Sequence, residues 1–387
     1  MRWRDVQHQD RALSLLKRGL AAGRTAHAYL FDGPEGVGKE LAARVLAARL
    51  LCRDVAPPGP ALFGDAPADD DACGRCEACL LLAAGNHPDF HLIHRGLHKL
   101  HPERTIRNSR GLTLSVEVVR HFLIDPAGLK PTVGSRRIFV IRDAERMHDA
   151  AQNALLKTLE EPPGAAVLVL VTASAERLLP TIRSRCQRVP FGRLPRAFIA
   201  AQLATQARVP APAAEALAGL ADGRLGPALR WHKLDLLGMV PDVLRLVAER
   251  RAANPEPFGK RIVELAEELG TRLTTGDADD SDAGDADGNG GARGRSRDLA
   301  TDVLRDAFKL VLLLIAAAYR DALLAHVGAR PALCLLAAHA PATKQLAARC
   351  SAEACQDAIR AVAAAEEMLD RNVAPQLAGE HLAVTLG

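Results

Sequence analysis

The sequence contains no long apolar run and carries little net charge. No stretch reaches the roughly 18 apolar residues that a membrane-spanning helix needs, and the longest candidate, Leu310–Ala318, is followed at once by polar residues. The N-terminus places Arg2, Arg4 and Asp5 where a secretory signal would have an apolar stretch. A formal net charge of +4 gives no overall indication of nucleic-acid binding. We therefore expect a cytoplasmic protein that does not enter a membrane.

The sequence does contain enough apolar residues for large cores, and its first half alternates short strands with helices. Hydrophobic residues make up 48% of the 387 residues, a length that favours two or three domains. The alternation predicts a parallel sheet covered on both faces, and continuous β-branched and leucine runs indicate strands that are buried on both sides. The expected strands are Ala28–Phe31, Asp89–Ile93, Arg137–Ile141, Ala166–Val171 and Gln187–Phe191.

The strand pattern stops at Pro195, and the remaining sequence is helical in character. The fold class is therefore α/β plus all-α, with an α/β domain over 1–194, a small helical domain over 195–240 and a larger helical domain over 241–387. Residues 275–297 interrupt the last domain and consist mainly of Gly, Asp, Ala and Ser. Such a segment cannot bury enough apolar surface to offset the entropy of ordering. We expect it to be a disordered insert, and its role is open.

The helix between the two clearest strands has recognisable ends. Asp149 followed by Gln152 resembles a capping box, in which two side chains bond the first backbone N–H groups of a helix. The adjacent residues Pro162 and Pro163 end the helix. We therefore expect one helix between residue 149 and these prolines.

A glycine-rich loop lies between the first expected strand and a helix over 40–51. Loops of the form G-x-x-x-x-G-K-[ST] hold phosphates with backbone N–H groups and a lysine, and use the hydroxyl to bind magnesium. Gly33, Gly38 and Lys39 meet the first two requirements, but Glu40 replaces the hydroxyl residue. Its carboxylate would repel phosphate groups. Binding of ATP or ADP is therefore left open, with a glycine turn that holds no ligand as the alternative.

The acidic pair that should follow the strand at 137–141 is also altered. Nucleotide hydrolysis of this kind needs one carboxylate for magnesium and another group to position the attacking water. Here the two positions are Arg142 and Asp143, so the first acid has become a base and the second is shortened. We therefore expect the chain by itself to lack ATPase activity.

Four cysteines have the spacing of a metal site. Cys73, Cys76 and Cys79 follow one another at two-residue gaps, and Cys52, just after the helix at 40–51, can supply the fourth thiol. Overlapping C-x-x-C units are typical of tetrahedral zinc, and disulfides are not expected in a reducing compartment. Because four thiolates leave no open coordination position, we expect the zinc to be structural.

Together these residues resemble the clamp-loader branch of the AAA+ proteins. The resemblance covers residues 1 to about 230 with specific motifs, and beyond that it rests on helical character and domain order. Its most distinctive parts are Asn153–Pro163 and the run Ser184-Arg185-Cys186. The other matching stretches are Ala26–Phe31, the four-cysteine module, Asn86–Asp89 and Leu178–Arg183. The gap between Cys52 and Cys73 is longer than the family pattern, although long loops add little to the entropy of closure.

The resemblance implies an AAA+ domain, a helical lid and a helical collar in a ring that opens a sliding clamp and places it on primed DNA. The partners would be ATP-hydrolysing motor subunits, called tau and gamma, and a delta subunit, within a polymerase assembly to which this chain brings no polymerase activity. By position, Arg185 would act in trans on a neighbouring ATPase, with a share for Arg183 left open. Thr172 would be the phosphate-sensing residue. Gly226 takes the place of the lid arginine, a further lost nucleotide contact.

Two other functions compete with this one. A motor-type subunit or standalone AAA+ ATPase would explain the glycine loop, but Glu40, Arg142 and Gly226 disfavour it. A zinc-dependent DNA-binding protein would explain the cysteines, but no dense basic helix adjoins them. Basic residues that could meet DNA phosphates within a ring, or simply face solvent, are Arg24, Lys130, Arg136 and Arg137.

Overall fold

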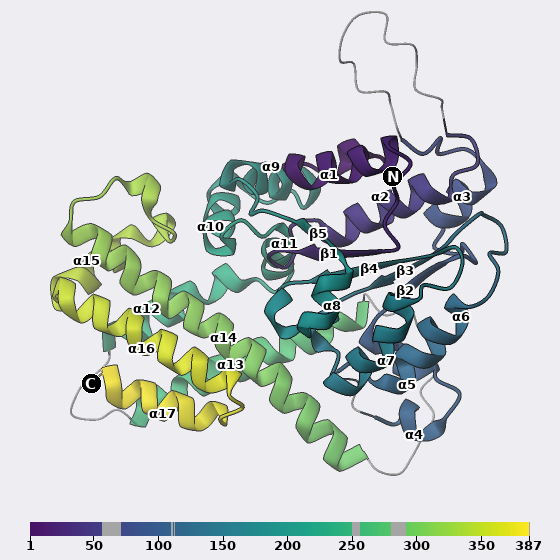
Figure 1. The fold of residues 1–387 in the computed structure, drawn as a ribbon. Helices are drawn as coiled ribbons and strands as arrows, with labels where there is room; N and C mark the ends of the chain where they lie inside the picture. Colours follow the sequence, from purple (N-terminus) through teal and green to yellow (C-terminus); the bar gives the residue numbers. More distant parts are fainter. Residues whose placement is uncertain (56–70, 110, 112, 250–255, 280–291, 387) are drawn as a thin grey trace, which may run out of the picture. The chain divides into compact units, whose positions relative to one another are not determined.

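The computed structural model describes residues 1–55, 71–109, 111, 113–249, 256–279 and 292–386. The chain divides into two compact units, Met1–Leu194 and Pro195–Gly387 (Figure 1). The first unit is built around a parallel sheet, and the described part of the second unit is built from helices. The predicted combination of an α/β part with an all-α part is thereby confirmed.

Five parallel strands form the sheet of the first unit, in the order β2-β3-β4-β1-β5. The strands are β1 (Ala28–Asp32), β2 (Phe90–Ile93), β3 (Arg137–Ile141), β4 (Ala166–Thr172) and β5 (Gln187–Pro190). Every residue of β3 and β4 is buried, as expected for central strands of continuous apolar sequence. The register pairs Asp32 with Thr172, so β1 and β4 end together at one edge of the sheet.

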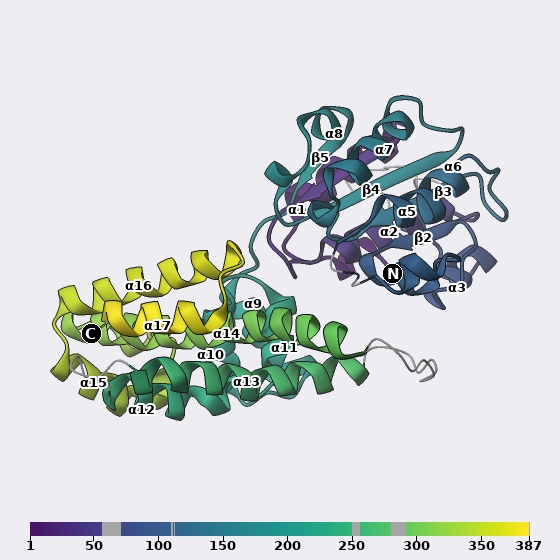
Figure 2. The same ribbon diagram turned by 90° about the horizontal axis from the view of Figure 1, so that it is seen from below.

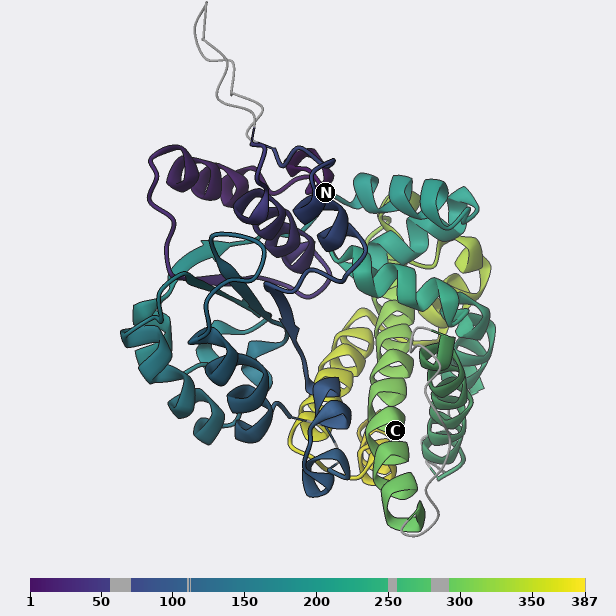
Figure 3. The same ribbon diagram turned by 90° about the vertical axis from the view of Figure 1, so that its right-hand side faces the viewer.

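Helices cover both faces of this sheet. Figure 1 shows α1 and α2 on one side and α5 and α7 on the other, and Figure 3 shows the same layers from the side. Alternate strand residues such as Leu30, Phe139 and Leu168 share a buried core with Leu155 of α7. The helices of this unit are α1 (Asp10–Ala21), α2 (Lys39–Leu51), α3 (Glu77–Ala83), α4 (Arg104–Arg107), α5 (Val116–Val119), α6 (Asp125–Ala127), α7 (Asp149–Glu160) and α8 (Pro180–Arg185).

The second unit begins with three short helices that pack on one another, α9 (Arg196–Gln206), α10 (Ala211–Ala221) and α11 (Leu225–Lys233). Trp231 is buried on the last of them, and the guanidinium of Arg224 lies over its ring at 5.8 Å from the centroid. Gly226 lies in α11, in this unit.

Four longer helices of the second unit pack in a cycle, in which α13 contacts α14 and α17, and α16 contacts α14 and α17 (Figure 2). Apolar side chains repeat at helical spacing on the inner faces, as with Ile262, Leu265 and Leu269 of α13, all of which are buried. The remaining helices are α12 (Val240–Glu249), α13 (Glu256–Asp279), α14 (Ala292–His326), α15 (Ala340–Arg349), α16 (Ala352–Asp370) and α17 (Pro375–Leu386).

The expectation of a disordered insert over 275–297 is wrong at both ends of that segment. Residues 275–279 belong to the end of α13, and residues 292–297 belong to the start of α14. The physical reason is that lengthening an existing helix costs far less than starting one, so polar residues next to a packed helix can continue it. Residues 280–291 lie outside the described part of the chain. Among the described helices, none is long and apolar enough to cross a membrane.

Candidate functional site

The glycine loop joins β1 to α2, and two of its glycines are required by the backbone. Gly33 has a φ of 155°, and a Cβ atom there would lie 2.3 Å from the backbone oxygen of Phe191, which follows β5. Gly38, with a φ of 99°, is the N-cap of α2. The loop therefore keeps the conformational features of a phosphate loop between a strand and a helix.

The ammonium group of Lys39 is bound by the loop itself. Its Nζ donates to the carbonyl oxygen of Pro34 at 2.5 Å and also to that of Gly33, and the residue is only 5% exposed. Burial lowers the pKa of Lys39, while nearby carboxylates, Glu145 first among them, act in the opposite direction. In a working phosphate loop this ammonium contacts phosphate oxygens. Here backbone carbonyls of the loop satisfy it.

Glu40, the second residue of α2, pairs with Arg142, which follows β3. Arg142 Nε donates to Glu40 Oε2 at 2.6 Å, and Nη2 donates to Oε1 at 2.9 Å, so the contact is bidentate. Arg44, one turn along α2, donates to Oε1 at 3.0 Å. Burial acts to raise the pKa of Glu40, but the bonds from Arg142 and Arg44 prevail and lower it. Two of the residues that depart from an ATPase pattern, Glu40 and Arg142, therefore form an ion pair with each other.

Carboxylates gather around the buried ammonium. Those whose charge acts on Lys39 are Glu145, Glu35, Asp143 and Asp32. Asp143 has a left-handed φ of 52°, and burial, followed by the charge of Glu145, raises its pKa. A triphosphate entering here would meet several like charges and a lysine that is already bound. The charges that surround Lys39 are therefore mainly negative.

Thr172 lies beside the glycine loop at the end of β4. It is 1% exposed, and its carbonyl oxygen accepts the N–H of Gly33 at 3.3 Å. Its hydroxyl accepts the N–H of Ser174 at 3.1 Å. The structure thus places Thr172 beside the glycine loop, with its hydroxyl engaged in a local turn.

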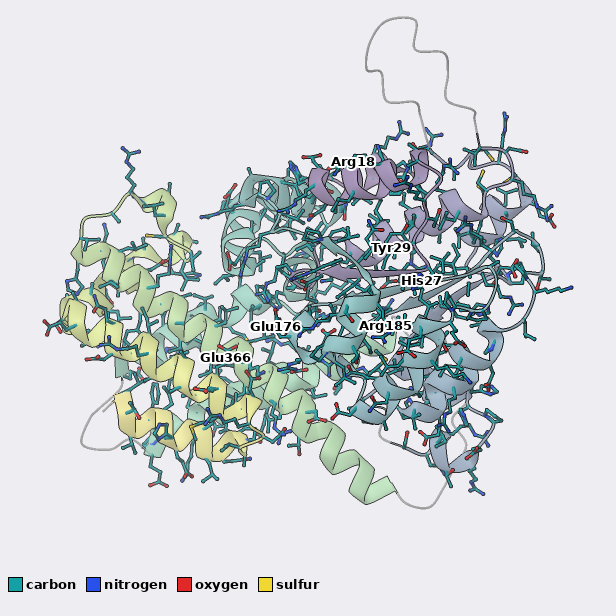
Figure 4. All side chains as sticks on the ribbon, viewed as in Figure 1. Arg18, His27, Tyr29, Glu176, Arg185 and Glu366 are labelled. Carbon is teal, nitrogen blue, oxygen red and sulfur yellow. The ribbon has the colours of Figure 1, made fainter. Side chains whose placement is uncertain are left out.

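Arg185 is the last residue of α8, the short helix between β4 and β5 (Figure 4). Its Nη2 lies 2.5 Å from Oε1 of Glu160, the last residue of α7, and its Nη1 donates to the backbone oxygen of Thr181 at 3.1 Å. The Arg185 side chain is 35% exposed. Arg183, by contrast, has a buried Nε atom that finds no hydrogen-bond partner in the described part of the chain. Of the two arginines, Arg185 is the one whose guanidinium is partly exposed and is held by an ion pair and by one backbone acceptor.

The prediction of a capping box at the start of α7 is wrong. The helix begins at Asp149 with His148 as its N-cap, and no side chain caps it. Gln152 is buried instead, where its Nε2 donates to the Met147 carbonyl at 2.9 Å and its Oε1 accepts the N–H of Leu179 at 2.8 Å. The physical reason is that the buried backbone before α8 needs a partner, and Gln152 supplies it. Sequence reasoning missed this role because the partners lie 27 residues apart.

The four cysteines of the predicted metal site converge. Cys52 follows α2, Cys76 is the N-cap of α3, and Cys79 lies within α3. All four sulfur atoms lie within 4.8 Å of one another, and the Sγ atoms of Cys52 and Cys76, like those of Cys73 and Cys79, are 4.0 Å apart. Zinc–sulfur bonds of about 2.3 Å place thiolates about 3.8 Å apart in a tetrahedron. The cluster therefore fits a tetrathiolate metal ion.

Backbone N–H groups are directed at two sulfur atoms of this cluster. The N–H of Cys73 points at Cys52 Sγ, and the N–H of Cys76 points at Cys73 Sγ, both at 3.3 Å. Gly74 between them has a φ of 72°, which permits the tight turn. Burial acts to raise the pKa of Cys76, but backbone donors, that of Arg53 first, lower it to about 6. At Cys52 and Cys79 burial prevails and raises the pKa, so in the metal-free chain the thiolate form is favoured at Cys76 and not at these two cysteines.

Asp89 is a structural residue whose role sequence reasoning missed. It is fully buried just before β2. Its carboxylate accepts the N–H groups of Thr132 and Val133 at 2.7 Å each and that of Gly134 at 3.0 Å, and lies 3.4 Å from Arg137 Nε. The available signal was a carboxylate at the start of an apolar strand, which cannot stay buried without partners.

A family model described as DNA polymerase III, delta subunit, matches residues 8–195 of this chain. The matched segment contains the sheet, the glycine loop, the cysteine cluster and Arg185. It ends within one residue of the boundary between the two compact units.

The curated relatives are also named as subunits of DNA polymerase III. The chain is 40% identical to the DNA polymerase III subunit delta' of Pseudomonas aeruginosa over 243 residues, which are 59% of this chain and 64% of that protein. It is 32% identical to the subunit delta' of Escherichia coli over 235 residues, 61% of this chain and 62% of that protein. To the subunit gamma/tau of Mycobacterium tuberculosis it is 34% identical over 200 residues, 52% of this chain and 30% of that protein. The chain covers less than two thirds of the length of these relatives.

Two solved structures align along most of the chain at low similarity. A DNA polymerase III gamma subunit-related protein from Thermotoga maritima covers 97% of this chain and 98% of its own, with 17% identity and a TM-score of 0.39. The clamp loader delta protein of Bacillus subtilis covers 97% and 99%, with 13% identity and a TM-score of 0.30. Scores of this size carry no argument, and the architecture rests on the sheet order and helix packing given above.

Proposed function

This chain belongs to the family of DNA polymerase III delta-prime subunits, and we propose that it completes a clamp-loader ring and lends Arg185 to a neighbouring ATPase subunit. In that role it supports ATP-dependent loading of a sliding clamp onto primed DNA during replication in the cytoplasm. Its partners are the motor subunits tau and gamma, a delta subunit and, through the complex, the clamp and the DNA. Relatives named gamma/tau among the matches support this set.

The observation that carries the proposal is the contrast between two parts of one domain. In the glycine loop, Glu40 replaces the hydroxyl residue that would bind magnesium, and its carboxylate is paired with Arg142. The Arg185 side chain lies at the surface and is 35% exposed. A chain built in this way is poorly equipped to use ATP and retains the group that a neighbour's ATP would need.

The chemistry assigned to Arg185 is the stabilisation of negative charge. When the terminal phosphoryl group is transferred to water, charge spreads over its outer oxygens, and an arginine from an adjoining subunit can neutralise it. The planar guanidinium contacts two oxygens at once, a geometry that lysine cannot copy. The ion pair with Glu160 and the hydrogen bond to Thr181 engage only some of the five N–H donors of Arg185. The remaining donors are those assigned to the phosphate.

The cysteine cluster has a structural task in this proposal. Cys52, Cys73, Cys76 and Cys79 hold one zinc ion, which joins the end of α2 to α3. Four thiolates leave no position for water or substrate. Zinc thus takes no part in the reaction and fixes the segment around α3.

The second unit is assigned two roles, one for each of its predicted domains. Residues 195–240 act as the helical lid, and residues 241–387 act as the collar that joins the ring. The pairwise packing of α13, α14, α16 and α17 supports a rigid collar. Nucleotide binding at Gly33, Gly38, Lys39 and Thr172 is the weaker part of the proposal, and if present it is a retained, unreactive site.

The test is a reconstituted ring that contains Arg185→Ala. The variant should assemble as the wild type does, because Arg185 is a partly exposed residue at a helix end. Turnover at the motor site that faces this subunit should fall by about 10³ to 10⁵-fold, the usual effect of an arginine supplied in trans. Arg177→Ala, an exposed arginine in the same segment, is the matched control and should behave as wild type. An intact Arg185→Ala ring with unchanged turnover at that site would rule the proposal out.

A further inference from the structure

We propose that Glu160 is a positioning residue for Arg185, an inference that rests on the proposed trans role of that arginine. Glu160 ends α7, and its Oε1 lies 2.5 Å from Arg185 Nη2. The carboxylate holds the guanidinium in one orientation before a neighbour arrives and stays paired with it afterwards. A phosphate then meets an arginine that is already ordered.

The two contacts on Arg185 act together. The Glu160 carboxylate forms an ion pair with Nη2, and the backbone oxygen of Thr181 accepts a hydrogen bond from Nη1 at 3.1 Å, so both terminal nitrogens of the guanidinium are engaged. An arginine side chain loses substantial rotamer entropy when it is fixed in one place. Because these contacts already order Arg185 in the free chain, less side-chain entropy is lost when the arginine binds phosphate.

Hydrogen bonds join the two helices that carry the pair. Gln152, two turns before Glu160 on the same helix, accepts the N–H of Leu179 at 2.8 Å and donates to the Arg177 carbonyl at 3.3 Å. These bonds tie α7 to the backbone that leads into α8. Glu160 ties the C-terminal end of α7 to the C-terminal end of α8. The carboxylate and the guanidinium are thus placed by two helices that are themselves held together.

The exposure of the pair limits the size of the effect. The Glu160 side chain is 47% exposed and that of Arg185 is 35% exposed, so solvent weakens both their attraction and the repulsion between Glu160 and an approaching phosphate. Glu160 can therefore orient the arginine without repelling the ligand strongly. The expected contribution is a modest factor in rate, well below that of Arg185 itself.

The test uses rings in which the other motor sites are inactivated, so that turnover reports the site facing this subunit. Glu160→Ala should lower kcat at that site by about two- to five-fold and leave ring assembly unchanged. Glu160→Gln keeps a neutral acceptor and should recover part of the loss. The matched control is Glu161→Ala, which removes the adjacent exposed carboxylate and should leave kcat unchanged.

A double variant separates positioning from an independent role. If Glu160 acts only through Arg185, adding Glu160→Ala to Arg185→Ala should cause no further loss. In the isolated chain, ¹⁵N relaxation of the Arg185 Nε–H group should show a more mobile side chain in Glu160→Ala than in Glu161→Ala.

The outcomes distinguish this inference from the proposed function. If Arg185→Ala lowers kcat at the facing motor site but Glu160→Ala leaves it at the wild-type value, the inference about Glu160 is overturned and the trans role of Arg185 still holds. A further loss in the double variant would also overturn it. A wild-type rate in Arg185→Ala would overturn both, whatever the relaxation measurement shows for the side chain.

Discussion

Glu40 and Arg142 stand 102 residues apart in the sequence and meet through two hydrogen bonds of 2.6 and 2.9 Å. Each residue alone weakens a nucleotide site, because Glu40 adds a negative charge to the phosphate loop and Arg142 replaces the carboxylate expected to bind magnesium. Together they form a compensated pair in the region where a phosphate-loop enzyme would organise magnesium. The two departures are therefore one structural feature.

The pair should be coupled in stability. Glu40→Ala and Arg142→Ala should each lower the free energy of unfolding of the chain by about 1 kcal/mol, a small value because the Arg142 side chain is 42% exposed. The double variant should lose less than the sum of the two single variants. Urea unfolding followed by circular dichroism measures all three. Strict additivity would show that the contact contributes nothing.

Hydrolysis of ATP by the isolated chain should be absent. Magnesium binding and water positioning are both compromised by Glu40 and by the Arg142-Asp143 pair, and groups that act as a unit are not restored one at a time. Glu40→Thr alone should therefore stay inactive and should also lose stability, since it leaves Arg142 without its carboxylate. Phosphate release measured with purified chain tests this. Steady turnover that disappears in Lys39→Ala would show that the motor-type function is correct.

Freshly purified protein should contain one zinc ion per chain, because four thiolates with this geometry favour that metal. Cys76→Ser should lose the metal and loosen the segment around α3 first. Limited proteolysis and elemental analysis measure the two effects. Cys334→Ser, which changes a half-buried cysteine outside the cluster, should keep the zinc. Full-length protein purified without metal, and unaffected by chelator, would contradict this prediction.

Asp89 should make the first unit sensitive to acid. Burial acts to raise the pKa of Asp89, but the three backbone N–H groups and Arg137 outweigh it and lower the pKa below its unfolded value. The carboxylate therefore contributes stability that is complete above about pH 5. This stability is lost as the pH falls through the folded-state pKa.

Asp89→Asn should lower the free energy of unfolding by about 3 kcal/mol at neutral pH, because Arg137 and the three backbone N–H groups then lose their buried negative partner. The loss should shrink toward low pH, where wild-type Asp89 is itself protonated. Thermal unfolding of both proteins from pH 3 to 7 measures the difference. A constant difference across that range would exclude the carboxylate as its source.

The sequence by itself determined the sheet, the cysteine cluster and the family. β3 and β4 were predictable because residues buried on both faces form continuous apolar runs, and the two-residue gaps between Cys73, Cys76 and Cys79 predict a metal site at any position in a fold. The glycine loop was equally recognisable, because its backbone needs glycine at Gly33 and Gly38 whether or not a ligand binds. These signals are local, so they need no tertiary information.

Only the tertiary structure decided what the altered residues do. The pairing of Glu40 with Arg142, the buried role of Gln152 and the backbone contacts of Asp89 all join segments far apart in the chain. Side-chain direction and burial decide such contacts, and neither is fixed by local sequence. A different reason applies to residues 275–297. Their composition predicts disorder, but α13 and α14 extend into both ends of the segment because a helix that already exists is easy to lengthen.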